Sequence, residues 1–154
     1  MKILGVDCST KLIAIFSIED GTGSGTTFSA SKDEIDSWFR AQDMFRKMVG
    51  YIMKEKPDMV YVENSPYLQN IKTTLQIYTV VDAVRFACSL NSVPVQTVEV
   101  TSWKKDILGN GKASKEAIME FAKAKWGAKI IKNQDIADAA CICLYGWKRM
   151  GENV

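Results

Sequence analysis

The residues with the clearest chemical potential are four carboxylates from three distant parts of the sequence, Asp7, Glu63, Asp135 and Asp138. Asp7 and Glu63 each stand where a short apolar run ends, and the carboxyl ends of neighbouring strands in an open α/β sheet share one edge. Asp135 and Asp138 lie in a segment with helical periodicity, about 60° apart around its axis and about one turn apart along it. We therefore expect the four side chains to converge.

Carboxylates this close cannot all stay ionised without a partner, because like charges raise one another's pKa. The sequence contains no histidine, which excludes catalytic triads with a histidine base and histidine-ligated zinc. A divalent cation is the natural neutraliser, and an all-oxygen ligand set selects Mg²⁺ or Mn²⁺. Two such ions about 3.5 to 4 Å apart can activate a water on one side of a phosphodiester and stabilise the leaving 3′ oxygen on the other. The chemistry implied is phosphodiester hydrolysis.

Each acid taken singly also has an ordinary structural explanation. Asp7 and Glu63 can end strands by accepting turn amides, and Asp135 suits the dipole of a helix N-terminus. Asp138 is harder to explain in this way, because residues 136, 137 and 139–141 around it are apolar and an unpaired acid among them is costly to bury. The physical argument for a functional acid is therefore strongest at Asp138.

A basic segment lies between the second and third of these regions. Residues 104–132 hold eight lysines against three acids, whereas the whole chain has a net charge of only +2. Such a segment either faces an anionic partner or is simply a solvated helix face.

The segments that must position the acids have the patterns of strands and helices. Apolar, β-branched runs predict strands at 2–7, 12–18, 59–62 and 93–98, with another at 26–29 after a glycine-rich turn at 21–25. A long amphipathic helix is predicted from a capping box at Ser31 and Glu34 until Pro57 stops it. Further helices are predicted at 72–89, at 114–126 before Gly127, and at 134–149 after Asn133.

A meander of three strands followed by strands that alternate with helices predicts an α/β fold. We expect a mixed five-stranded sheet, with three antiparallel and then parallel strands, and helices on both faces. This architecture resembles the ribonuclease H-like fold. At 154 residues the chain fits roughly one domain, so residues 1–154 are expected to form a single domain.

The composition bounds the class of protein. Apolar residues make up 47% and charged residues 25%, which is ordinary for a globular chain. No stretch approaches the roughly 20 apolar residues of a membrane span, and Asp7 comes too early for a secretory signal. The cysteines at 8, 88, 141 and 143 form no metal-binding pattern and are expected to be reduced. We expect a soluble, intracellular, cytoplasmic protein.

At several positions the sequence resembles the RuvC family of Holliday junction resolvases, and the resemblance spans nearly the whole chain. The segments GVDCST, YVEN and DIADAA are similar to the family's three acidic motifs, and KKDILGNGKASK resembles its lysine and glycine pattern. The resemblance implies catalytic, metal-binding roles for Asp7, Glu63, Asp135 and Asp138. It also implies essential roles for Lys104 and Lys115, with two Mg²⁺ or Mn²⁺ ions per active site.

The resemblance also implies a partner and an assembly. The substrate would be branched DNA, cut by paired symmetric nicks in recombination and repair, and the enzyme would be a homodimer. Lys105, Lys112 and Tyr67 are expected to contact this DNA, the tyrosine by stacking on an unpaired base. The predicted helix at 72–89 has apolar residues on more than one face, which makes it the candidate dimer interface.

The sequence departs from the family pattern at two places. Cys8 and Ser9 replace the commoner Pro and Gly, and Pro66 stands where the family's junction aromatic is usual, with Tyr67 next to it. This divergence bears on how a junction is distorted and on the sequence preference of cleavage. It is compatible with a phage-encoded protein that acts in a host cell, and the sequence identifies no branch-migration motor.

Three other readings remain open. A ribonuclease H-type or transposase-type nuclease can use a similar carboxylate set, the former on RNA in hybrids. A non-catalytic protein that binds branched DNA would use only the basic segment. The opening segment also resembles the phosphate-binding start of actin-like ATPases and sugar kinases, but those need two such domains.

Overall fold

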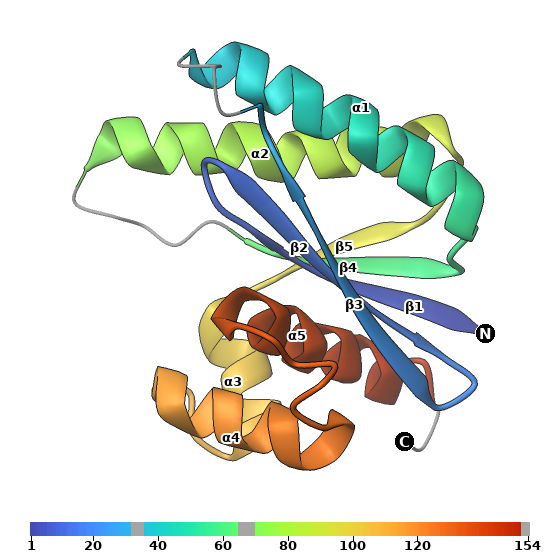
Figure 1. Ribbon diagram of the computed structural model, residues 1–154, viewed down its shortest axis with the longest axis vertical. Helices are drawn as coiled ribbons and strands as arrows, with labels where there is room; N and C mark the ends of the chain where they lie inside the picture. Colours follow the sequence, from blue (N-terminus) through green and yellow to red (C-terminus); the bar gives the residue numbers. More distant parts are fainter. Residues whose placement is uncertain (32–35, 65–69, 152–154) are drawn as a thin grey trace.

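In a computed structural model of the protein, residues 1–31, 36–64 and 70–151 are described. They contain one five-stranded sheet with helices on both of its faces (Figure 1). The strands are β1 (Lys2–Cys8), β2 (Leu12–Glu19), β3 (Thr22–Ser29), β4 (Met59–Glu63) and β5 (Val95–Val98). The helices are α1 (Ser37–Glu55), α2 (Ile71–Leu90), α3 (Val100–Leu108), α4 (Lys115–Trp126) and α5 (Gln134–Arg149).

The sheet has the strand order β3-β2-β1-β4-β5. β1 pairs with β2, and β2 with β3, in antiparallel fashion, whereas β1 pairs with β4, and β4 with β5, in parallel. The predicted mixed α/β sheet, with three antiparallel and then parallel strands, is therefore confirmed. The parallel pairings matter most for function, because they bring the carboxyl ends of β1 and β4 to one edge.

Alternation along the strands sorts the apolar residues into two cores. Ile13 and Ile15 of β2 pack with α1 and α2, whereas Ala14, Phe16 and Ile18 of the same strand pack with α5 and its neighbours. Successive side chains of a strand point to opposite faces, and a sheet covered on both faces reads as a continuous apolar run. This explains why the sequence shows little polar alternation in β2.

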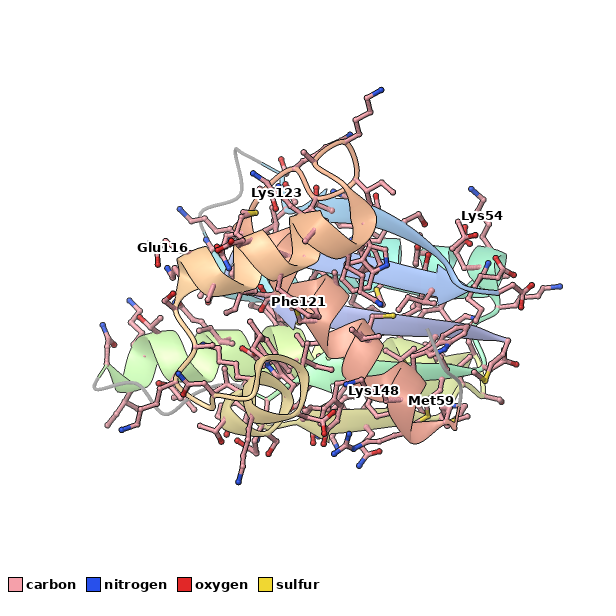
Figure 2. The ribbon with its side chains drawn as sticks, turned by 90° about the horizontal axis from the view of Figure 1, so that it is seen from below. Lys54, Met59, Glu116, Phe121, Lys123 and Lys148 are labelled. Atoms are coloured by element: carbon pink, nitrogen blue, oxygen red, sulfur yellow. The ribbon has the colours of Figure 1, made fainter. Side chains whose placement is uncertain are left out.

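The two helical layers differ in how they contact the sheet. α1 and α2 cover one face, and α5 lies centrally on the other, between the sheet and α3 and α4 (Figure 1). Figure 2 looks onto this second layer, where α4 carries the exposed side chains of Glu116 and Lys123. Its Phe121 is partly buried and packs against the core. None of the described helices is long and apolar enough to cross a membrane.

β3 begins earlier than predicted. The turn is confined to Asp20 and Gly21, both with positive φ, and the strand starts at Thr22. The glycines that follow are therefore not turn residues. A Cβ atom at Gly23 would lie 2.6 Å from Phe16 and 2.7 Å from Trp126, so glycine is required here by packing.

The start of α1 was also predicted incorrectly. The helix begins at Ser37, and its cap is Asp36, whose side chain accepts a hydrogen bond from the N–H of Trp38 at 2.8 Å. Ser31 lies outside the helix, and Glu34, its predicted partner, lies outside the described residues. Both Ser31 and Asp36 are of residue types that favour the N-cap position. Asp36, which is nearer to the packed part of the helix, is the cap.

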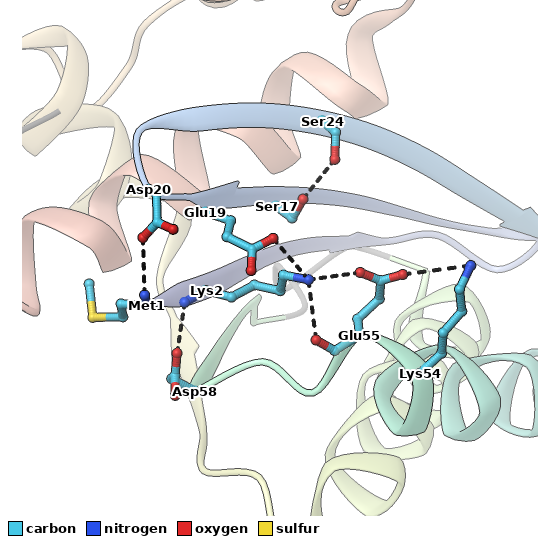
Figure 3. Close-up of polar contacts among 9 residues, drawn as sticks. All are labelled: Met1, Lys2, Ser17, Glu19, Asp20, Ser24, Lys54, Glu55 and Asp58. Carbon is cyan, nitrogen blue, oxygen red and sulfur yellow. Dashed lines mark hydrogen bonds and ion pairs between the residues drawn. The ribbon is translucent and has the colours of Figure 1, made fainter.

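The end of β1 remote from Asp7 is fixed by Lys2 (Figure 3). Its ammonium group pairs with Glu19 of β2 at 3.1 Å and with Glu55 of α1 at 2.9 Å. The backbone N–H of Lys2 also donates to Asp58 at 2.7 Å, just before β4 begins. This cluster ties β1 to three neighbouring segments and leaves the opposite sheet edge free for the acids.

Candidate active site

Two of the predicted acids stand side by side at the carboxyl end of the sheet. Val6 of β1 is the register partner of Val62 of β4, so the next residues along the two parallel strands are Asp7 and Glu63. This is the edge at which open α/β sheets place their ligands. The predicted placement of both acids at neighbouring strand ends is confirmed.

The other two acids come from the first turns of α5. Asn133 caps this helix by accepting a hydrogen bond from the N–H of Ile136 at 2.9 Å, which places Asp135 in the first turn and Asp138 in the second. The predicted helix and its cap are confirmed.

α5 is pressed against β1 at Gly5. A Cβ atom on Gly5 would overlap the carbonyl oxygen of Ala139 and the main chain of Cys143. Gly5 is two residues before Asp7, and Ala139 directly follows Asp138. The close contact of these two backbones therefore brings the acids of the helix to the acids of the sheet.

The four carboxyl groups are near enough to affect one another. Burial raises the pKa of Asp7 well above its usual range, and the charges of Glu63, Asp138 and Asp135 raise it further. The structure thus brings all four predicted acids into one electrostatic cluster.

Two of the acids have neutral hydrogen-bond donors. Burial raises the pKa of Glu63 to about 7, although a hydrogen bond from the indole Nε1 of Trp103, at 2.6 Å, acts to lower it. Burial also raises the pKa of Asp138, against a hydrogen bond of 2.9 Å from Nε2 of Gln134. These two donors hold the carboxylates in fixed orientations.

Two lysines act on this cluster from α3 and α4. The positive charge of Lys104 lowers the pKa of both Glu63 and Asp138, and that of Lys115 lowers the pKa of Asp138. Both lysines are therefore near enough for their charges to act on the acids. Lys105 and Lys112 are exposed on the same α3–α4 segment, whereas Tyr67 lies outside the described residues.

The glycine and lysine pattern forms the connection between α3 and α4. Gly109 ends α3 in a left-handed conformation, with φ of 76°, and Ser114 caps α4 by accepting from the N–H of Ala117 at 3.1 Å. Between them, Asn110 accepts from the N–H of Lys112 at 2.9 Å, and the side chain of Ala113 is buried. This fixed turn sets the distance between the two lysines.

Sequence reasoning missed α3 and the residues that orient the acids. Trp103 and Ile107 are the buried residues of α3 and stand four apart, and Gly109 follows the helix. This spacing and the glycine are a helix signal, although the lysines and glycines dominate the pattern of this short segment. No local signal in the sequence links Trp103 to Glu63 or Gln134 to Asp138.

The donor set of the cluster fits a hard divalent cation. All four candidate ligands are carboxylates. Because they are buried and repel one another, a bound cation would stabilise their charged forms. Among the described residues, no three His, Cys, Asp or Glu side chains are already arranged to hold a metal ion.

Comparison with known proteins gives a consistent result. The family model for the crossover junction endodeoxyribonuclease RuvC matches residues 3–145 of this chain. RuvC from Carboxydothermus hydrogenoformans is 28% identical, over 98% of this chain and 98% of that protein. RuvC from Brachyspira hyodysenteriae is 30% identical, over 68% of this chain and 65% of that protein.

Solved structures share the fold. Thermus thermophilus RuvC in complex with a Holliday junction substrate aligns with a TM-score of 0.82 at 21% identity, over 98% of this chain and 96% of that one. The yeast mitochondrial Holliday junction resolvase aligns with a TM-score of 0.58 at 13% identity, over 96% and 83% of the two chains.

Proposed function

This chain belongs to the RuvC family of crossover junction endodeoxyribonucleases, and we propose that it cuts four-way DNA junctions by divalent-metal-dependent hydrolysis of a phosphodiester. The observation that carries this proposal is the meeting of four carboxylates at one sheet edge, with Lys104 and Lys115 acting on the same cluster. A purely structural set of acids would gain nothing from such mutual repulsion.

We propose that Asp7, Glu63, Asp135 and Asp138 hold two Mg²⁺ or Mn²⁺ ions. When bound, these ions would supply Lewis acidity and a water of lowered pKa. The chain's own contribution is to fix the ligands before substrate arrives. Gln134 and Trp103 hold two carboxylates by hydrogen bonds, and the contact at Gly5 fixes α5 against β1.

The two lysines suit the binding of the scissile phosphate. Lys115 is the first residue of α4, where a cation is unfavourable for the helix dipole, so its position is not explained by helix stability. An ammonium group beside the carboxylates can hold a phosphate oxygen and stabilise developing negative charge. We propose that Lys105 and Lys112 extend this positive surface along the DNA backbone.

The substrate is tested with three labelled nucleic acids, a four-way junction, a linear duplex of the same sequence and an RNA–DNA hybrid, each with Mg²⁺ or Mn²⁺. Paired symmetric nicks in the junction, with the duplex left intact, are the expected result. Cleavage of RNA in the hybrid would instead favour a ribonuclease H activity. Binding of the junction without cleavage in either metal would contradict the proposal and favour an architectural protein.

We also propose that the enzyme is a homodimer through α2. One side of this helix is buried on the core, whereas Ile71, Leu75, Phe86 and Leu90 are more than 60% exposed on it. Between α1 and α2 lies a cavity of about 430 Å³ whose lining includes Trp38, Phe45 and Phe86. A large exposed apolar surface of this kind indicates a protein interface, and two matched cuts require two active sites.

Sedimentation tests the dimer. The wild-type chain should sediment as a dimer at micromolar concentration, and Leu75→Glu should sediment as a monomer that still folds. The matched control is Met53→Glu, on α1 but outside the cavity lining. A monomeric wild-type chain would contradict the proposal.

The packing of the apolar cores bears on the number of domains. In the described part of the chain, one apolar core lies on each face of the same sheet. This supports the proposal that residues 1–154 form one nuclease domain.

A further inference from the structure

Trp103 makes the shorter of the two side-chain hydrogen bonds described above for the acids, which involve Glu63 and Asp138. Its indole Nε1 donates to Oε2 of Glu63 at 2.6 Å, shorter than a usual N–H···O bond and typical of a donor that faces a charged acceptor. The side chain is only 1% exposed and is among the largest fully buried side chains of the protein. The indole ring therefore has little freedom to move away from the carboxylate.

This hydrogen bond is not simply what burial of an indole demands. Among the described residues, Trp126 and Trp147 also have buried Nε1 atoms, and neither has a hydrogen-bond partner. The same core therefore tolerates unpartnered indole groups, although each has a cost. Of the three buried indoles, the one with an acceptor is the one that contacts the active-site cluster.

The residue after Glu63 is held by the end of β5 and by the cap residue of α3. The next residue, Asn64, donates its backbone N–H to the carbonyl of Val98 at 2.8 Å and its side-chain amide to Glu99 at 2.7 Å. Glu99 is the cap residue of α3, yet its side chain makes no capping hydrogen bond. The end of β4 is thus fixed to the start of α3, one turn before Trp103.

We propose that Trp103 is a positioning residue for Glu63, whose indole N–H fixes the carboxylate in the orientation needed to bind the divalent ion. The proposal rests on the proposed function. With Oε2 held, the carboxylate cannot rotate freely, so less conformational entropy is lost when the ion binds. Trp103 also carries Lys104 as its neighbour, and the Lys104 ammonium lies 5.6 Å from the centre of the Trp103 ring. One buried side chain therefore lies next to both an acid and a lysine of the site.

The test is Trp103→Phe, which keeps an aromatic ring and removes the N–H donor. The matched control is Trp147→Phe, which removes a buried indole N–H that has no partner. Binding of Mn²⁺ is measured by calorimetry on the folded proteins without DNA. Trp103→Phe should weaken Mn²⁺ binding about 10- to 100-fold, the usual effect of losing a residue that orients a metal ligand. Trp147→Phe should leave it unchanged, even where both variants unfold at lower urea concentrations than the wild type.

An equal change in Mn²⁺ affinity for the two variants, or none for Trp103→Phe, would overturn the proposal. Because the measurement needs no DNA, it tests Trp103 whether or not the wild-type protein cuts junctions. In the working enzyme, the concentration of Mn²⁺ that gives half-maximal cleavage should differ between Trp103→Phe and the wild type by the same factor as the Mn²⁺ affinity.

Should Trp103→Phe fail to fold, the wild-type protein provides a second measurement. Each indole N–H gives its own nitrogen-15 NMR signal, and Mg²⁺ is diamagnetic. Titration with Mg²⁺ should shift the Trp103 signal and leave those of Trp126 and Trp147 in place. A Trp103 signal that does not move at saturating Mg²⁺ would overturn the proposal without any variant.

Discussion

Gly5 of β1 faces the main chain of Ala139 in α5 so closely that no side chain fits between them. This contact is the point at which the helix that carries Asp135 and Asp138 meets the strand that carries Asp7. The close approach of the α5 acids to Asp7 therefore depends on the absence of one Cβ atom. Glycine is used here for close packing of two backbones.

Gly5→Ala should separate the two pairs of acids. The added methyl group overlaps backbone atoms, which cannot move aside as a flexible side chain can, so we expect a loss of about 1 to 3 kcal/mol in the free energy of unfolding. Mn²⁺ affinity should fall as well, because α5 must shift. Urea denaturation and calorimetry measure the two effects.

The matched control is Gly50→Ala on α1, where a Cβ atom meets nothing within 4 Å and alanine should stabilise the helix by about 0.5 to 1 kcal/mol. Unaltered Mn²⁺ binding in Gly5→Ala would refute this role of the contact.

Asp7→Asn and Asp138→Asn should each abolish cleavage while junction binding is retained. Replacing one ligand charge weakens metal capture much more than it weakens contacts to phosphates, so we expect a loss in cleavage rate of more than about 10²-fold. Gel-shift titration in EDTA and a cleavage assay in Mg²⁺ separate the two properties. Asp58→Asn is the control, because Asp58 accepts from Lys2 at the far end of β1. If both active-site variants still cut junctions, these residues are not the metal ligands.

Lys115→Ala should slow cleavage by about 10²-fold, the usual effect of removing one group that stabilises transition-state charge. Lys123→Ala, also exposed on α4, should leave the rate unchanged. Lys104→Ala should slow cleavage and also lower the slope of log affinity against log salt concentration by about 1, as expected for one lost phosphate contact. These quantities come from single-turnover rates and from binding titrations at several salt concentrations. Equal rates for Lys115→Ala and Lys123→Ala would assign Lys115 to the solvated surface.

Local signals predicted α5 to the residue and α4 to within one residue, since Ser114 is the cap of α4 and not its first helical residue. Ser114, Gly127 and Asn133 are cap residues that act within one turn of the helix end, so their effect is visible in a short window of sequence. The placement of Asp7 and Glu63 at strand ends, and of Asp135 and Asp138 on one helix face, was also predictable, because strand ends and helical spacing are local properties. The start of α1 was not, since Ser31 and Asp36 are both good caps and only tertiary packing selects between them.

The features that were missed depend on contacts between distant residues. Gly23 looked like part of a turn because nothing nearby in the sequence shows that Trp126 occupies the space beside it. Trp103 and Glu63 are 40 residues apart, and their hydrogen bond exists only because β4 and α3 meet. The orienting residues of an active site are typically of this kind, since they act through the fold.

In the absence of metal, the burial of the acids should make the free energy of unfolding depend on pH. Burial raises the pKa of Glu63 from an ordinary 4.5 to about 7, so between these values the folded protein binds more protons than the unfolded chain. Stability must then fall as pH rises through this window, and the loss persists at higher pH. Asp7 and Asp138 act in the same direction, because burial raises their pKa values too.

Glu63→Gln isolates the contribution of one acid. Because glutamine does not ionise, the stability of Glu63→Gln relative to the wild type should increase from pH 5 to pH 8, by up to about 3 kcal/mol. Urea denaturation in EDTA at intervals across this range measures the difference. Addition of Mg²⁺ at pH 8 should raise the unfolding temperature of the wild type more than that of the variant, because the ion neutralises the charge that glutamine lacks. A difference in stability between the two proteins that stays constant with pH would show that Glu63 is ionised in the folded protein at no cost, which would contradict the electrostatic basis assigned to this site.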